Sequence, residues 1–176
     1  MVVHERVCEV YAATGGTGEL SIGSGTLVAA RLVLTSAHVV GPVGTAAQLR
    51  FLGASARYSG TVAWRRYDAE ADAALVEISD PPYADPDMVG PLRWGRLVCA
   101  RPDTRCEAVG FPTVQVGANG VRDTEHLSGS VRPLGAFKSG RLDVAVDAGT
   151  AATSTGSPWA GMSSARIRIT KLDAMC

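Results

Sequence analysis

The chain consists of short runs of β-forming residues separated by glycine and proline, and this pattern constrains its fold more than any other feature. Twenty glycines and nine prolines interrupt segments rich in Val, Leu, Ile and Thr in a chain of 176 residues. No stretch of roughly 12 or more residues keeps the 3.6-residue period of an amphipathic helix. Short apolar or alternating runs between turn residues are typical of strands. The sequence therefore predicts an all-β protein.

Six of these runs lie in the first half of the chain. The expected strands span residues 6–12, 24–29, 31–35, 47–52, 60–66 and 73–78. Six strands at this spacing can close a small barrel. We therefore expect a first β unit over residues 1–78.

A proline-rich segment then interrupts the strand pattern. Residues 79–91 hold four prolines and three aspartates, and proline cannot donate to a sheet ladder, so this segment is interpreted as a linker. Strands are expected again at 106–111, 113–117, 126–134 and 142–147. We therefore expect a second β unit over residues 92–176, with fewer strands than the first.

The charges are balanced, with 17 basic and 17 acidic residues and a net charge of zero. No run of like charge predicts a nucleic-acid or membrane partner. No apolar stretch approaches the roughly 18 residues of a membrane span, and residues 1–12 do not resemble a secretory signal. The expected location is the cytoplasm, or outside the cell if Met1 is not the true start.

The chain shows no pattern typical of a metal or cofactor site. Its four cysteines have no Cys-x-x-Cys spacing; Cys99 and Cys106 could pair across a hairpin, but free thiols are the favoured interpretation. The glycine-rich residues 14–20, "TGGTGEL", are not followed by Gly-Lys-Ser/Thr, which disfavours a phosphate loop. No cofactor is expected.

One histidine stands out within an apolar stretch. His38 lies in "LTSAHVVG", residues 34–41, and a lone histidine of this kind is usually structural unless other groups join it. Acyl transfer by a serine needs a hydroxyl, an imidazole, an orienting carboxylate and backbone donors for the oxyanion. Asp72, at the entry of the apolar run 73–78, is the candidate carboxylate.

The candidate nucleophile is Ser163, in the loop sequence "STGSPWAGMSSA". Gly161 lets the chain turn so that the N–H groups of Gly161 and Ser163 converge, as in an oxyanion hole. Ser157 and Ser164 are competing hydroxyls in the same loop.

Five motifs occur in an order that matches a known family. They are "GSGTLV", "LVLTSAHVV", "DAALVEI", "AVGFP" and "GSPWAGMSSA". Over residues 5 to about 165 the chain resembles the trypsin-like serine peptidases of the chymotrypsin fold, particularly their bacterial branch. The resemblance implies two six-stranded antiparallel β-barrels, of which the second is incomplete in this chain.

The resemblance also implies roles for individual residues. His38 would be the general base and later the acid, Asp72 its orienting carboxylate and Ser163 the nucleophile. Gly161 and Ser163 would donate to the oxyanion, and Ser157 would lie at the base of the primary specificity pocket. The reaction implied is hydrolysis of a peptide bond in a peptide or protein substrate through an acyl-enzyme, without a metal.

The sequence departs from the family pattern at several points. Met162 replaces the aspartate that precedes the nucleophile in animal digestive members, so activation by propeptide cleavage is not implied. Ser164 replaces the usual glycine, and Ser157 offers no negative charge that would select Lys or Arg. After Ser163 only residues 164–176 remain, so we expect an unclosed second barrel, impaired turnover and possible further domains in a longer gene product.

Two alternatives belong to other functional classes. The first is a catalytically inactive trypsin-like barrel that acts as an interaction module. The second, an esterase of the α/β-hydrolase type, is disfavoured because that fold needs helices and the order Ser, Asp, His.

Overall fold

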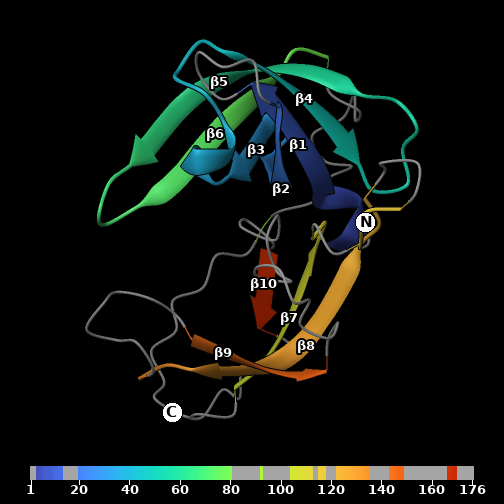
Figure 1. Cartoon of the computed structure of the whole chain (residues 1–176), viewed down its shortest axis with the longest axis vertical. Coiled ribbons are helices and arrows are strands. Elements are labelled where there is room, and N and C mark those ends of the chain that lie inside the picture. Colours follow the sequence, from blue (N-terminus) through green and yellow to red (C-terminus); the bar gives the residue numbers. More distant parts are fainter. Residues whose placement is uncertain are drawn as a thin grey trace.

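The computed structural model describes residues 3–13, 20–80, 92, 104–112, 115–117, 122–134, 143–148 and 166–169. Within these residues the regular structure is β-strand, apart from two short 3-10 helices, η1 (Val3–Arg6) and η2 (Ala37–Val39). The all-β prediction is confirmed. A barrel and a separate sheet lie one above the other, with the N-terminus near the junction between them (Figure 1).

The first six strands close into an antiparallel barrel in the order β1-β2-β3-β6-β5-β4. These strands are β1 (Val7–Ala13), β2 (Leu20–Ala29), β3 (Leu32–Thr35), β4 (Ala46–Phe51), β5 (Tyr58–Tyr67) and β6 (Asp72–Ile78). The ring is completed by pairing of β1 with β4, where Cys8 lies opposite Phe51. Closure leaves no strand with an unpaired edge. The six strands predicted for the first half of the chain are present, and β2 begins four residues earlier than expected, at Leu20.

The barrel core is made by alternate residues of each strand. On β1 the side chains of Cys8, Val10 and Ala12 are buried among those of the other five strands. Removal of this apolar surface from water stabilises the barrel by about 25 cal/mol for each Å² buried. Burial also raises the pKa of the Cys8 thiol well above its usual range. Cys8 and Cys106 are both free thiols, whereas Cys99 and Cys176 lie outside the described residues.

The second unit contains a four-stranded antiparallel sheet in the order β10-β7-β8-β9. These strands are β7 (Thr104–Gly110), β8 (Glu125–Arg132), β9 (Asp143–Ala148) and β10 (Arg166–Ile169). As far as the chain is described, this sheet does not close, so the prediction of a complete first barrel and a partial second one is confirmed. Of the segment 79–91 that was interpreted as a linker, the structure describes Ser79 and Asp80, which form a bend.

One expected strand is wrong in its described part. Residues 113–117 were expected to extend, but Gln115 donates its N–H to the carbonyl of Pro112 at 3.1 Å, so the chain turns there. Val116 then makes a single isolated bridge with Arg122. Proline fixes its own φ near the value that suits a turn, which explains why the apolar run did not become a strand.

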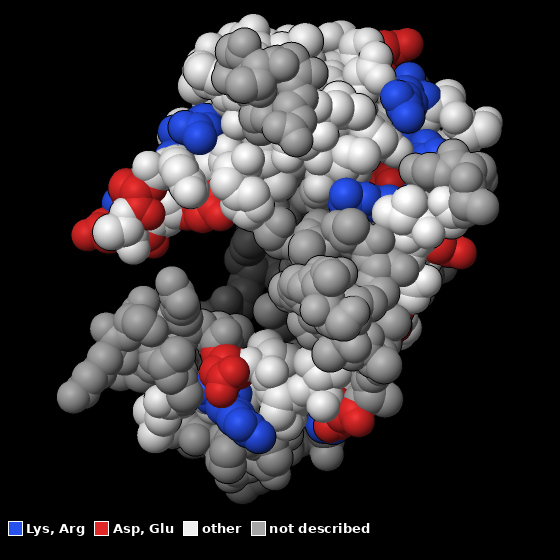
Figure 2. Space-filling model, viewed as in Figure 1, with Lys and Arg blue, Asp and Glu red and all other residues white. Residues whose placement is uncertain are grey.

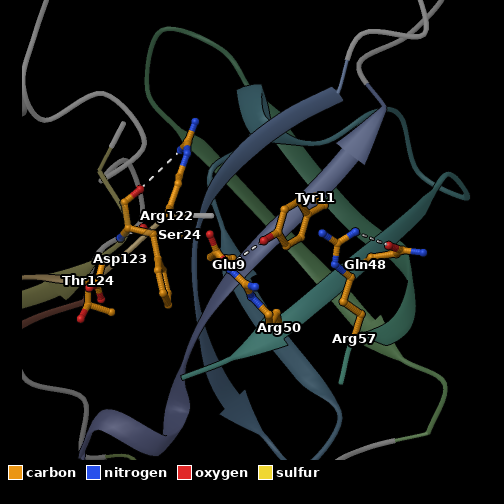
Figure 3. A network of polar contacts seen from close by, with 10 residues as sticks. Glu9, Tyr11, Ser24, Gln48, Arg50, Arg57, Arg122, Asp123 and Thr124 are labelled. Atoms are coloured by element: carbon orange, nitrogen blue, oxygen red, sulfur yellow. Dashed lines mark hydrogen bonds and ion pairs between the residues drawn. The ribbon is translucent and has the colours of Figure 1, made fainter. Parts of the chain in front are cut away.

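The sheet meets the barrel along the outer face of β1 and β2. Val7 packs against Val109 and Phe111, and the N–H of Phe111 donates to Ser24 Oγ at 3.0 Å. Arg122, labelled in Figure 3, donates to the carbonyl of Ile22 at 3.2 Å and to that of Phe111 at 3.4 Å. Arg122 therefore ties β2 of the barrel to the segment that follows β7.

A buried carboxylate lies beside this junction. Glu9 is completely buried on the outer face of β1, where it accepts hydrogen bonds from Tyr11 Oη at 2.6 Å and from Arg50 Nε at 2.7 Å (Figure 3). Burial and the Glu9 contact raise the pKa of the Tyr11 hydroxyl. The guanidinium carbon of Arg57 lies over the Tyr11 ring, 4.1 Å from its centroid. Because a buried charge is tolerated only when it is paired, Arg50 is the group that allows Glu9 to remain there.

Candidate active site

His38 lies on the short helix η2, directly after β3. Ser36 is extended at its start (φ −78°, ψ 143°), and the turn closes with N–H donation from Val39 to the Ser36 carbonyl at 3.2 Å and from Val40 to the Ala37 carbonyl at 3.4 Å. Ala37 and Val39 are buried, whereas the His38 side chain is 42% exposed. The apolar residues around His38 therefore anchor the turn in the barrel core, and the imidazole projects from it.

A glycine on β2 provides the space for this anchor. A Cβ atom at Gly23 would lie 2.6 Å from a methyl carbon of Val39, closer than real contacts allow. A hydrogen bond from Thr35 Oγ1 to the Ser24 carbonyl, 2.9 Å long, holds the adjacent part of β2 to the end of β3. Gly23 is the first residue of the motif "GSGTLV", and its role beneath the turn was not predicted from the sequence.

Asp72 is the first residue of β6, and the pairing of β3 with β6 brings it beside the histidine turn. In this ladder Thr35 lies opposite Ala74, two residues from Asp72. The His38 Nδ1 and Asp72 Oδ2 atoms are 2.5 Å apart. The backbone N–H of His38 donates to Asp72 Oδ1 at 3.0 Å. Both oxygens of the carboxylate are therefore directed at one residue.

These contacts determine the charge and the tautomer of the pair. Partial burial raises the pKa of the Asp72 carboxyl, but the hydrogen bonds from the His38 side chain and backbone outweigh burial and hold this pKa below its usual range. Asp72 is therefore ionised at neutral pH and acts as an acceptor, which assigns the proton of the neutral imidazole to Nδ1. The basic lone pair is then on Nε2, the nitrogen that can take a proton from a hydroxyl.

The other predicted site residues are not described. Ser163, Gly161 and Ser157, together with Met162 and Ser164, lie outside the described residues. The structure thus brings together His38 and Asp72, which are 34 positions apart in the chain.

The face drawn in Figure 2 has no concentrated charge, and the described residues form no metal site. On the face in Figure 2, acidic and basic side chains are interspersed, and the surface is hollowed on the side where the β5–β6 hairpin projects. Among the described residues no three His, Cys, Asp or Glu side chains gather as metal ligands. No helix in the described part of the chain is long and apolar enough to cross a membrane. The absence of a nucleic-acid partner stays a prediction.

Comparison with known proteins gives a family match and a fold match. The model of the trypsin-like peptidase domain matches residues 23–165. A search of curated protein sequences finds no match.

Solved structures of peptidases have a similar fold. A Glu endopeptidase has a TM-score of 0.62 at 16% identity, with 95% of this chain and 74% of that chain covered. Deg5 has a TM-score of 0.56 at 16% identity, covering 94% and 75%. The Rv3671c protease from M. tuberculosis, in its active form, has a TM-score of 0.51 at 19% identity, covering 74% and 49%. The chain thus spans about half the length of the Rv3671c protease, and at these identities the likeness concerns the fold.

Proposed function

The chain belongs to the trypsin-like peptidase family, and we propose that it is a serine endopeptidase whose triad is His38, Asp72 and Ser163. The observation that carries this proposal is the contact between the two described members, in which both Asp72 oxygens meet His38. A carboxylate held in this way orients the imidazole and stabilises its protonated form. The family match spans all three residues.

In the proposed reaction His38 accepts and then gives up one proton in each of the two half-reactions. As Ser163 Oγ attacks the carbonyl carbon of the scissile peptide bond, its proton passes to Nε2 of His38, and the carbonyl oxygen becomes an oxyanion held by the N–H groups of Gly161 and Ser163. The imidazolium then gives the proton to the leaving amine, and the C–N bond breaks to form the acyl-enzyme. A water molecule, deprotonated by His38, then attacks the acyl carbon; the ester C–O bond breaks, the imidazolium returns the proton to Ser163 Oγ, and the acid product leaves.

The position of β10 supports the assignment of Ser163. β10 begins at Arg166, three residues after Ser163, and Arg166 pairs with Val109 near the end of β7 that meets the barrel. Three residues span at most about 10 Å. The segment that carries the proposed nucleophile therefore joins the sheet at the end that packs against β1 of the barrel.

The proposed substrate is a peptide or protein. Ser157 at the base of the specificity pocket, as the family pattern implies, would be neutral and would not select a basic side chain. The chain is therefore proposed to prefer substrates in which the residue before the cleaved bond has an uncharged side chain.

An active-site-directed fluorophosphonate probe tests the proposed mechanism. We expect the probe to label the wild-type chain and to leave Ser163→Ala unlabelled, because labelling requires an activated serine. Ser164→Ala is the matched control, since it removes a neighbouring hydroxyl and should keep its label. Asp72→Asn should slow turnover of a casein-type substrate on the order of 10⁴-fold, because the imidazole then adopts the wrong tautomer. Labelling that persists in Ser163→Ala would contradict the assignment.

The alternative is a trypsin-like barrel without turnover that acts as an interaction module. The observation that favours it is the second sheet, which is open as far as it is described. Catalysis requires the nucleophile to be held to within about 1 Å, since a misplacement of that size can cost about 100-fold. A chain that is folded by NMR and remains unlabelled by the probe would support the module. Ser163-dependent labelling would support the peptidase.

A further inference from the structure

Strand β5 contains a bulge just before it reaches the candidate site. In its ladder with β6, Val62 lies opposite Val76, but the next pair joins Trp64 to Leu75. Ala63 is therefore an extra residue on β5. Bulges of this kind often occur beside active sites, where they redirect a side chain.

The residue that this bulge redirects is Arg65. Residues directly opposite each other in an antiparallel ladder project from the same face. With the bulge Arg65 lies opposite Ala74, whose side chain is fully buried in the barrel core. Without the extra residue Trp64 would take this place, whereas in the structure Trp64 is 44% exposed. The bulge thus directs a guanidinium, rather than an indole, to the end of the barrel where η2 lies.

Arg65 contacts the histidine turn directly. Its Nε–H donates to the carbonyl oxygen of Ala37, the residue before His38, at 3.1 Å. Its guanidinium carbon also lies 5.3 Å from the ring centroid of Tyr67, and Tyr67 pairs with Asp72 across the β5–β6 ladder. One arginine therefore connects the strand that flanks Asp72 with the turn that carries His38.

We infer that Arg65 is a positioning residue that holds the His38 turn against Asp72, and this inference rests on the roles proposed above for those two residues. Two neutral N–H donors close the turn itself, and one of their bonds is long, at 3.4 Å, which makes it weak. A charged donor from a neighbouring strand is stronger. A shift of the turn would disturb both bonds to Asp72, because one comes from the His38 backbone and the other from its ring.

The next residue on β5 offers a matched control. Arg66 is also an arginine, but it pairs with Asp68 and Glu70 at the surface of the β5–β6 hairpin. Replacement of either arginine by methionine removes one charge and keeps much of the apolar stem. Only the Arg65 variant removes a contact with the turn.

Amide hydrogen exchange of the full chain, followed by NMR, tests the inference. The His38 N–H donates to Asp72, so its exchange rate reports on the contact that Arg65 is inferred to maintain. In Arg65→Met we expect this amide to exchange about ten-fold faster, while amides of β1 and β4 keep their rates. In Arg66→Met the His38 amide should exchange as in the wild type, and Arg65→Lys, which keeps a charged donor, should restore part of the protection.

Two outcomes would overturn the inference. An unchanged His38 amide in Arg65→Met would show that the turn does not depend on Arg65. An equal rise in the exchange rates of the β1 and β4 amides would show a general structural role instead. If Arg65→Met does not fold, the same comparison is made on Arg65→Lys. This measurement needs no turnover, so it stands apart from the test of the proposed peptidase activity.

Steady-state kinetics of peptide hydrolysis by the chain give a second test of the role of Arg65. We expect Arg65→Met to lower kcat by about 10- to 100-fold and to change KM by less than about two-fold, since Arg65 affects proton transfer and not substrate binding. A change confined to KM would contradict a positioning role.

Discussion

The barrel and the second sheet differ in how they bury their apolar residues. The barrel is closed, and its six strands and the histidine turn share one continuous core. In the described part of the second unit the buried apolar residues are few, and two of them, Val109 on β7 and Phe111 just after it, pack against Val7 of the barrel. The barrel therefore provides its own core, whereas the described sheet depends on the barrel for part of its packing.

This difference bears on the candidate site. His38 lies on the turn that follows β3 and Asp72 begins β6, the strand paired with β3, so both residues of the pair belong to the closed barrel. The proposed nucleophile is connected to the sheet through β10, and the sheet is connected to the barrel by a few specific contacts. If Ser163 is the nucleophile as proposed, we expect its alignment with the pair to depend on the junction made by Ser24, Phe111 and Arg122.

The largest difference in stability loss should appear when one fully buried valine is truncated in each of the two regions. Val76 on β6 and Val131 on β8 are both fully buried. We expect Val76→Ala to lower the free energy of unfolding by about 2–3 kcal/mol and Val131→Ala by about 1–2 kcal/mol, because an open sheet can relax into the space more easily than a closed barrel. Denaturant titration of both variants measures the two losses. Equal losses would argue against the distinction.

A smaller effect is expected at the junction. Arg122→Met removes a charged donor that bonds one carbonyl on each side. We expect a loss of about 1–2 kcal/mol, below the range for fully buried charged donors because Arg122 is partly exposed. Limited proteolysis should then cut the second half sooner and leave β1 to β6 intact.

Arg132 on β8 is the matched control for this variant. Its side chain is exposed and lies 4.0 Å from Asp143 in a surface pair. Such pairs contribute little, so Arg132→Met should not change the cleavage pattern. If both variants speed cleavage equally, Arg122 has no special role at the junction.

The smallest expected effect is a change in the stability of the barrel with pH, which arises from Asp72. Because the pKa of Asp72 is held below its usual range in the folded chain, ionised Asp72 contributes stability above about pH 4, and this contribution is lost as the pH falls through its folded pKa. Asp72→Asn should therefore be less stable than the wild type at pH 7, and the difference should shrink toward pH 3. Denaturant titrations of both chains at the two pH values measure it. A difference that stays constant with pH would show that the ionised carboxylate is not its source.

Sequence reasoning was most reliable where local chemistry decides the structure. Alternating apolar residues and turn-forming glycines predicted the six strands of the barrel, since these preferences act within a few residues. The apolar stretch around His38 singled out this histidine, and the family resemblance gave it an expected role. The run 113–117 was predicted wrongly because Pro112 begins a turn in which Gln115 bonds back to it.

Several decisive features depend on residues that are far apart in the chain. Nothing in "VCEVYA" indicates that Glu9 is completely buried; that follows from Arg50, 41 positions away, and from the junction with the second sheet. Likewise, no local pattern distinguishes Arg65 from Arg66. The bulge at Ala63 separates their roles, and it exists only in the pairing of β5 with β6.

By itself the sequence determined the β-strands, the order of the peptidase motifs and the candidates His38 and Asp72, because each of these depends on short stretches of residues. Only the tertiary structure decided that β1 closes the barrel against β4 and that both oxygens of Asp72 meet His38. It also decided that Arg65 reaches the turn that carries His38. The physical reason is that ladder register and barrel closure bring together groups from distant strands, and these pairings depend on packing across the whole barrel rather than on the preferences of any one segment.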